Sequence, residues 1–294
     1  MKTLPVALAA QSLEALSWSG ILIPALMAGV VATGVTVAIE RWGGQLGGLI
    51  GTMPSTIVPA SIGIAQQSTD AAAFEAAMYI TPAGMFLNAL FLYLWRALPP
   101  RLPQGWSLRG RLAAMTAVSL ACWLVAALVM VLVVGALREQ AAWTLPALGW
   151  GTTALIALVG VLACRKAPPA PGGRKPVSPT TLFARGALAA VAIGAAVFLA
   201  TIGGPLAAGV AAVFPAIFLT TMVSLWISQG ESVQVGAVGP MMLGSTSVAA
   251  FSVIAAAAIP ALGTAPGVLV AWFGAVFGAT VPAWAWLRRV RADA

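Results

Sequence analysis

Long uninterrupted runs of apolar residues make up most of the chain, and short segments between them hold most of the charged residues. Nine runs reach the roughly 20 helical residues that are needed to cross the hydrocarbon core of a bilayer. Because apolar residues fill these runs instead of alternating with polar ones, the runs predict helices and not strands. The predicted spans lie near residues 19–39, 44–66, 71–97, 112–137, 142–164, 182–202, 204–228, 232–259 and 265–287.

The composition excludes most soluble functions. Apolar residues make up 61% of the 294 residues and charged residues 7%, whereas a soluble domain carries about 25% charged residues. The chain has no histidine and no phosphate-binding GxxxxGK[ST] motif, which excludes serine–histidine catalysis, histidine metal sites and a fused P-loop ATPase. We therefore expect an all-α polytopic integral membrane protein that is not an enzyme and needs no cofactor.

Basic residues predict the orientation in the membrane. With nine spans and the N-terminus outside, every basic residue except Lys2 and Arg138 falls on one face. The positive-inside rule makes that face cytoplasmic, so we expect a multi-pass protein of the cell (inner) membrane with its C-terminus in the cytoplasm. Tryptophans near predicted span ends suggest an interfacial belt, namely Trp18, Trp42, Trp95, Trp143, Trp226, Trp284 and Trp286.

The chain divides into four predicted regions. Residues 1–18 form an outer-surface segment, for which a short signal peptide is the alternative. Residues 19–164 form the first membrane half, with spans 1 to 5. Residues 165–181 are rich in proline, glycine and basic side chains and predict a cytoplasmic linker. Residues 182–294 form the second membrane half, with spans 6 to 9.

The two halves resemble each other in sequence. Residues 42–61 align with residues 203–222 when Pro54 is placed over Pro215, and two glycines then match. Because span 5 stands between the matched groups of four spans, the second group crosses the membrane in the opposite sense. The pattern predicts two inverted-topology repeats of four spans with span 5 as a spacer, a plan that recurs in secondary transporters.

Prolines mark the predicted site. Pro54 and Pro215 fall near the midplane of spans 2 and 7, and Pro82 and Pro240 form a second matched pair in spans 3 and 8. Proline removes a backbone donor, and the freed carbonyls need partners inside the protein. Hydroxyl, amide and thioether groups gather there. The predicted substrate-binding residues are Thr52, Met53, Pro54, Ser55, Thr56, Thr81, Asn88, Pro215, Thr220, Thr221, Pro240, Ser245 and Thr246.

Acidic residues within or beside the spans are few. Glu75 lies about one turn inside span 3, and an ionisable group there is a candidate for proton coupling. An interfacial role for Glu75, close to the headgroups, is the alternative. No metal site is defined, and the candidate ligands are Glu75, Glu231, Met53 and Met241.

The sequence favours a secondary transporter, or permease, that moves a small solute or ion by alternating access at the disrupted helices. A cation or metal-ion permease that uses Glu75 and Glu231 is one alternative, and a membrane scaffold or assembly protein without transport is another. A hydroxyl acting with Glu75 alone is the remaining enzymatic alternative. The expected partners are membrane lipid and a small solute or ion. No nucleic acid is expected, and a homo-oligomer stays open.

Overall fold

The computed structural model describes residues 18–42, 53–138, 144–165, 178–202, 204–229 and 231–292, and every regular element within these ranges is helical. Thr52, most of the predicted 1–18 segment, the start of predicted span 2 and most of the 165–181 linker lie outside them. The elements are α2 Trp18–Trp42, α4 Ile57–Gln67, α5 Ala71–Ala97, the 3-10 turn η1 Pro99–Arg101, α6 Leu108–Arg138, α7 Thr144–Arg165, α8 Pro179–Ile202, α9 Gly204–Ala211, α10 Ala216–Gln229, α11 Glu231–Leu262, α12 Thr264–Ala275, the π-helical segment η2 Val276–Thr280 and α13 Val281–Ala292.

Seven segments of the described chain are long and apolar enough to cross a membrane. They are α5, α6, α7, α8, α9 with α10, α11, and α12 with η2 and α13. The helix α2 adds a shorter apolar stretch, Trp18–Gly34. The chain therefore has the helix lengths and the composition of a multi-pass membrane protein. These seven match predicted spans 3 to 9 in order, and α2 coincides with predicted span 1.

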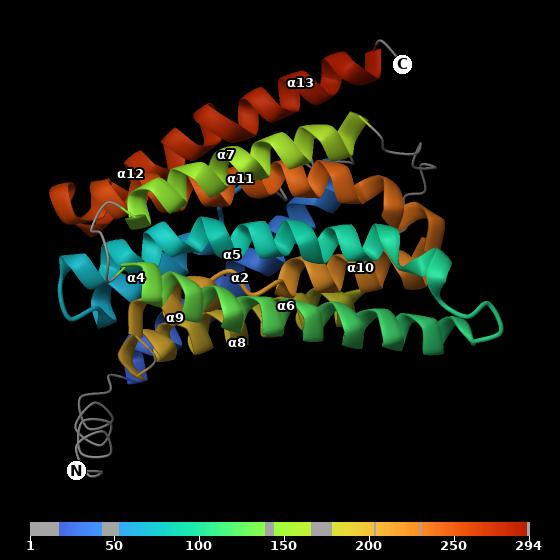
Figure 1. Cartoon of the computed structure of the whole chain (residues 1–294), viewed down its shortest axis with the longest axis horizontal. Helices are drawn as coiled ribbons and strands as arrows, with labels where there is room; N and C mark the ends of the chain where they lie inside the picture. The colour runs from blue at the N-terminus through green and yellow to red at the C-terminus, as the bar shows by residue number, and fades with distance from the viewer. Residues whose placement is uncertain are drawn as a thin grey trace.

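Two long helices occupy the centre of the bundle. In its apolar segment, α11 is 72% buried and α5 is 67% buried, against 22% for both α6 and α7. The helix α11 packs against α5, α7 and α12, while α5 also contacts α6, α7 and α9. On one flank α2 packs along α8. Figure 1 shows these helices running along the long axis of the molecule. The arrangement leaves α6 and α12 with wide apolar outer faces, as a helix in contact with lipid requires.

Glycines let the helices approach closely. A Cβ atom at Gly160 of α7 would lie 2.5 Å from the Cα atom of Leu243 of α11. A Cβ atom at Gly29 of α2 would lie 3.0 Å from the carbonyl oxygen of Gly186 of α8. Small residues at such crossings are typical of membrane helices, where close packing replaces hydrophobic driving force.

Basic side chains hold one end of the bundle together. Arg96, at the end of α5, donates to the carbonyl oxygen of Ala163 near the end of α7 at 3.1 Å. Arg111, at the start of α6, donates to the carbonyl oxygen of Pro99 at 2.9 Å. The 98–107 loop lies at the same end of the molecule as the end of α13 (Figure 1). Arg96 and Arg111 therefore lie at one end of the bundle.

The predicted tryptophan belt is wrong at two positions. Trp95 and Trp226 are fully buried, and their rings meet edge to face at 6.0 Å between centroids. The indole N–H of Trp95 donates to the hydroxyl of Ser119 at 3.1 Å. A tryptophan near a span end faces the headgroups only if its side of the helix faces lipid, and these two face neighbouring helices. Trp18, by contrast, is 65% exposed.

Candidate functional site

The predicted interruption at Pro215 is present. The helix α9 ends at Ala211, residues 212–215 form a turn, and α10 begins at Ala216. The amide of Ala216 donates across Pro215 to the carbonyl oxygen of Phe214 at 2.7 Å. The regular ladder then resumes, because the amide of Leu219 donates to the carbonyl oxygen of Pro215 at 2.8 Å. The segment α9–α10 is thus a discontinuous helix in the interior of the bundle.

A similar turn precedes α4. Residues 53–56 are not helical, and α4 begins at Ile57 with Thr56 as an N-cap that makes no side-chain capping bond. The amide of Ser55 donates across Pro54 to the carbonyl oxygen of Met53 at 2.7 Å. This bond has the same length and the same place relative to proline as the bond across Pro215. The two matched prolines therefore share one local backbone geometry, which the sequence alignment alone did not require.

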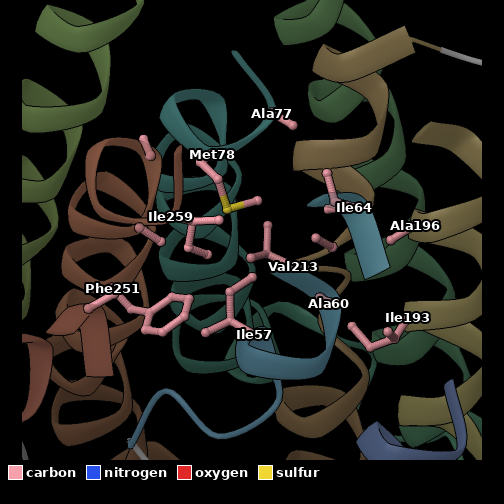
Figure 2. Packing of buried hydrophobic residues seen from close by; sticks show 14 of the residues in the cluster. Ile57, Ala60, Ile64, Ala77, Met78, Ile193, Ala196, Val213, Phe251 and Ile259 are labelled. Atoms are coloured by element: carbon pink, nitrogen blue, oxygen red, sulfur yellow. The ribbon is translucent and has the colours of Figure 1, made fainter. Parts of the chain in front are cut away.

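The turns at Pro54 and Pro215 meet in the core. We call the buried side chains around them the central apolar cluster, which includes Ile57, Ile64, Met78, Val213 and Phe251. Figure 2 shows Val213, from the α9–α10 turn, between Met78 of α5 and Ile57 at the start of α4. Since α4 and α10 both begin here and run outward, the positive ends of two half-helices are directed toward the same region.

Polar groups of the first half hold the broken helix. The hydroxyl of Thr81 in α5 donates to the carbonyl oxygen of Ala77 at 2.8 Å and lies 3.2 Å from that of Gly209 in α9. The side-chain amide of Asn88 donates to the carbonyl oxygen of Val213 at 2.7 Å. Interruption frees carbonyls that must find partners away from water. Asn88 and Thr81 supply them.

Trp123 of α6 completes this arrangement. Its indole N–H donates to the side-chain oxygen of Asn88 at 2.7 Å, and its ring meets Phe214 edge to face at 5.4 Å. Both polar atoms of the Asn88 amide are therefore engaged with the protein. Trp123 was not among the residues predicted from the sequence. A tryptophan in the middle of an apolar run nevertheless needs a buried acceptor for its N–H, and this need is a usable signal.

Polar residues of the second half are also buried. The hydroxyl of Ser245 donates to the carbonyl oxygen of Met241 within α11 at 3.0 Å. The hydroxyl of Thr280 donates to that of Ser247 at 2.7 Å and joins η2 to α11. The Thr246 hydroxyl is buried without a hydrogen-bond partner. Thr280 was not selected from the sequence, because only the fold brings it to Ser247.

The other predicted substrate-binding residues are distributed around the two turns. Thr220 is buried and donates to the carbonyl oxygen of Ala216 at 2.9 Å. Both α5 and α11 continue through their prolines, so among the four matched prolines of the described chain only Pro54 and Pro215 lie in non-helical turns. Pro54, Pro215 and Thr81 are buried, and Met53, Ser55, Thr56, Thr221 and Pro240 are partly buried.

The candidate metal ligands lie apart from a recognisable metal site in the part of the chain that the structure describes. Glu75 is partly exposed in the second turn of α5, and the Glu231 side chain lies outside the described part of the chain. Among the described residues, no group of three or more Cys, Asp or Glu side chains could hold a metal ion. Met241 packs beside the buried residues Val238 and Met242 of its own helix.

Comparison of the chain with known protein families, with characterised proteins and with solved structures gives no match. Function must therefore be argued from the geometry of the interrupted helices.

Proposed function

We propose that the chain is a secondary transporter of a small solute, with its substrate site where the α9–α10 interruption meets the start of α4. The observation that carries this proposal is the discontinuous helix at Pro215, which lies in the core against Ile57 at the start of α4. Helices interrupted at mid-depth expose backbone N–H and C=O groups to a ligand, and regular spans cannot do so. Irregular backbone at that depth is otherwise costly.

The contacts between helices support two inverted repeats. The helix α2 packs on α4 as α8 packs on α10, and α5 packs on α6 as α11 packs on α12. The helix α7 contacts both α5 and α11, as a spacer between two related halves should. The shared backbone bond across Pro54 and Pro215 supports the same pairing. In such folds one repeat rocks against the other, and the central site opens to each side in turn.

In the proposed orientation, the arginine-rich end of the bundle faces the cytoplasm and the start of α2 faces outside, in the inner membrane. The position of Arg96 and Arg111 at one end supports this through the positive-inside rule. Glu75 would then lie on the outer side of span 3, where a carboxyl group is placed to take up a proton from the medium.

Thiol accessibility tests this function. Cys122 and Cys164 are thiols that are not joined in a disulfide, so both are first replaced by alanine. Thr56→Cys and Thr220→Cys then place one thiol at the N-cap of α4 and one in the second turn of α10. Alternating access predicts that a membrane-impermeant maleimide labels these thiols from each face of oriented vesicles. A scaffold without a central pathway predicts no labelling from either face, and that result would refute transport.

A further inference from the structure

Buried hydroxyl groups gather in the middle of α11, in the second half of the bundle. Thr246 stands at the midpoint of this 32-residue helix. Its hydroxyl oxygen is buried and has no hydrogen-bond partner. Its neighbours Ser245 and Ser247 are 2% and 1% exposed. An unpaired hydroxyl in an apolar interior is unfavourable, so a native structure that keeps one calls for an explanation.

The π-helical segment η2 adds a second hydroxyl to this region. Thr280, the last residue of η2, donates to the oxygen of Ser247 at 2.7 Å. A hydroxyl that accepts one bond keeps its own proton for another, so the Ser247 proton is free to point at a ligand. π-helical turns are rare and occur often at functional sites. Here the π turn brings Thr280 onto Ser247.

The first half offers an internal comparison. When Pro82 is paired with Pro240, Thr246 takes the place that Asn88 has in the first half. The side-chain amide of Asn88 is hydrogen-bonded to Val213 and Trp123, whereas the hydroxyl of Thr246 has no hydrogen-bond partner in the protein. The two halves therefore differ in one respect. The polar group of the first half stabilises the broken helix, and the matching group of the second half remains unpaired.

Charge restricts what such a site binds. The segments around it carry no charged side chain between Glu75 and Arg96 in α5, after Glu231 in α11, or anywhere in α12 and η2. A net charge brought to this depth without a countercharge is strongly unfavourable. A hydroxyl, in contrast, both donates and accepts, which suits an uncharged polar group.

We propose that the hydroxyls of Thr246 and Ser247 bind a small uncharged polar solute, with Thr280 as the residue that orients Ser247. This inference rests on the proposed transport function and specifies its substrate class, and it places the principal contact on α11, a helix that packs against both α4 and α10. It also separates two roles among the predicted site residues. Thr246 contacts the solute, and Asn88 is a positioning residue that acts through the α9–α10 turn.

Thermal unfolding of the purified full chain in detergent tests the assignment. The probes are small amides, lactams and polyols at millimolar concentration, with sodium acetate and potassium chloride as charged probes. A solute that binds only the folded state raises the unfolding midpoint by mass action. Thr246→Val keeps the side-chain shape and removes the hydroxyl. Thr153→Val in α7 is the matched control, because the Thr153 hydroxyl donates within its own helix to Gly149 at 2.7 Å.

We expect an uncharged probe to raise the midpoint of the wild type and of Thr153→Val. Thr246→Val should lose about tenfold or more in apparent affinity for that probe. Without solute, its midpoint should equal or exceed that of the wild type, because an unpaired group has been removed. Ser247→Ala should weaken the response as well, and it serves as a second variant if Thr246→Val does not fold.

Three results would overturn the assignment. The first is an unchanged response to the uncharged probe in Thr246→Val. The second is stabilisation of the wild type by charged probes only, or by none of the panel. The third is a solute-free Thr246→Val whose unfolding midpoint is lowered as much as that of Asn88→Leu. That result would mean that the Thr246 hydroxyl is hydrogen-bonded within the fold. The transport proposal is tested separately, and it is refuted if neither Thr56→Cys nor Thr220→Cys is labelled.

Discussion

Replacing Asn88 by leucine removes the group that holds the α9–α10 interruption. Leucine keeps the branching of the asparagine side chain, although its methyl groups are bulkier than the amide, and two hydrogen bonds of 2.7 Å are lost. The carbonyl oxygen of Val213 loses its donor, and the indole N–H of Trp123 loses its acceptor. Asn88 is 2% exposed, so water does not readily replace either partner.

The magnitude follows from the cost of orphaned buried groups. Each unsatisfied donor or acceptor costs about 1–3 kcal/mol, which gives about 2–6 kcal/mol for the pair before relaxation. Trp123 and Phe214 pack edge to face, and small movements of these rings will relieve part of the loss. We therefore expect Asn88→Leu to lower the free energy of unfolding by about 2–4 kcal/mol.

A double-mutant cycle isolates the bond between Asn88 and Trp123. Trp123→Phe removes the indole N–H, so Asn88→Leu should cost about 1 kcal/mol less in that background than in the wild type. Unfolding is followed by circular dichroism in mixed micelles with increasing dodecyl sulfate. Ser252→Ala is the control, because the buried Ser252 hydroxyl donates within its own helix to Val248 at 3.0 Å. If Asn88→Leu costs no more than Ser252→Ala, the Asn88 bonds do not hold the interruption.

Further predictions concern packing, capping and backbone strain, and each is measured by the same unfolding assay. Gly160→Ala places a methyl group 2.5 Å from the backbone of Leu243 and should cost about 1–3 kcal/mol, while Gly151→Ala, which meets nothing within 4 Å, should be neutral or stabilising. Asp70→Ala removes the N-cap bond of α5, 2.7 Å long, and should cost about 1 kcal/mol; Asp70→Asn should retain most of it. Gly263→Ala forces a side chain to a φ of +84° and should cost about 1–2 kcal/mol. An equal effect of the two α7 glycine changes, or no effect at Asp70 or Gly263, would contradict these estimates.

Features that depend on local chemistry were predictable from the sequence. Continuous apolar runs predicted the helices, and the predicted start of span 3 at residue 71 agrees with the observed start of α5, which Asp70 caps. Pro215 was expected to interrupt its span, and it does. Proline acts on its own backbone whatever the tertiary context, so such positions can be read from the sequence.

Features that depend on the direction of a side chain were not predictable in the same way. Trp95 and Trp226 have the composition and position of interfacial residues, yet neighbouring helices cover them. Asn88 was predicted to bind substrate because it is a polar residue at mid-depth. In the structure its amide is hydrogen-bonded to Val213 and Trp123. Both outcomes depend on which neighbouring helix faces the side chain. A helix that is apolar on all sides gives little indication of which side packs against a neighbour.

Cross-linking of the two interruptions tests most directly that they meet in the core. In the background without Cys122 and Cys164, Ile57→Cys and Val213→Cys are combined and treated with a short bifunctional maleimide. Contact between the turn and the start of α4 predicts an efficient intramolecular cross-link. A control pair joins Ile57→Cys to Val191→Cys, a position on α8 that is 69% exposed, and should not react within the chain. Failure of the first pair to cross-link, or equal cross-linking of both pairs, would contradict a shared site at the interrupted helices.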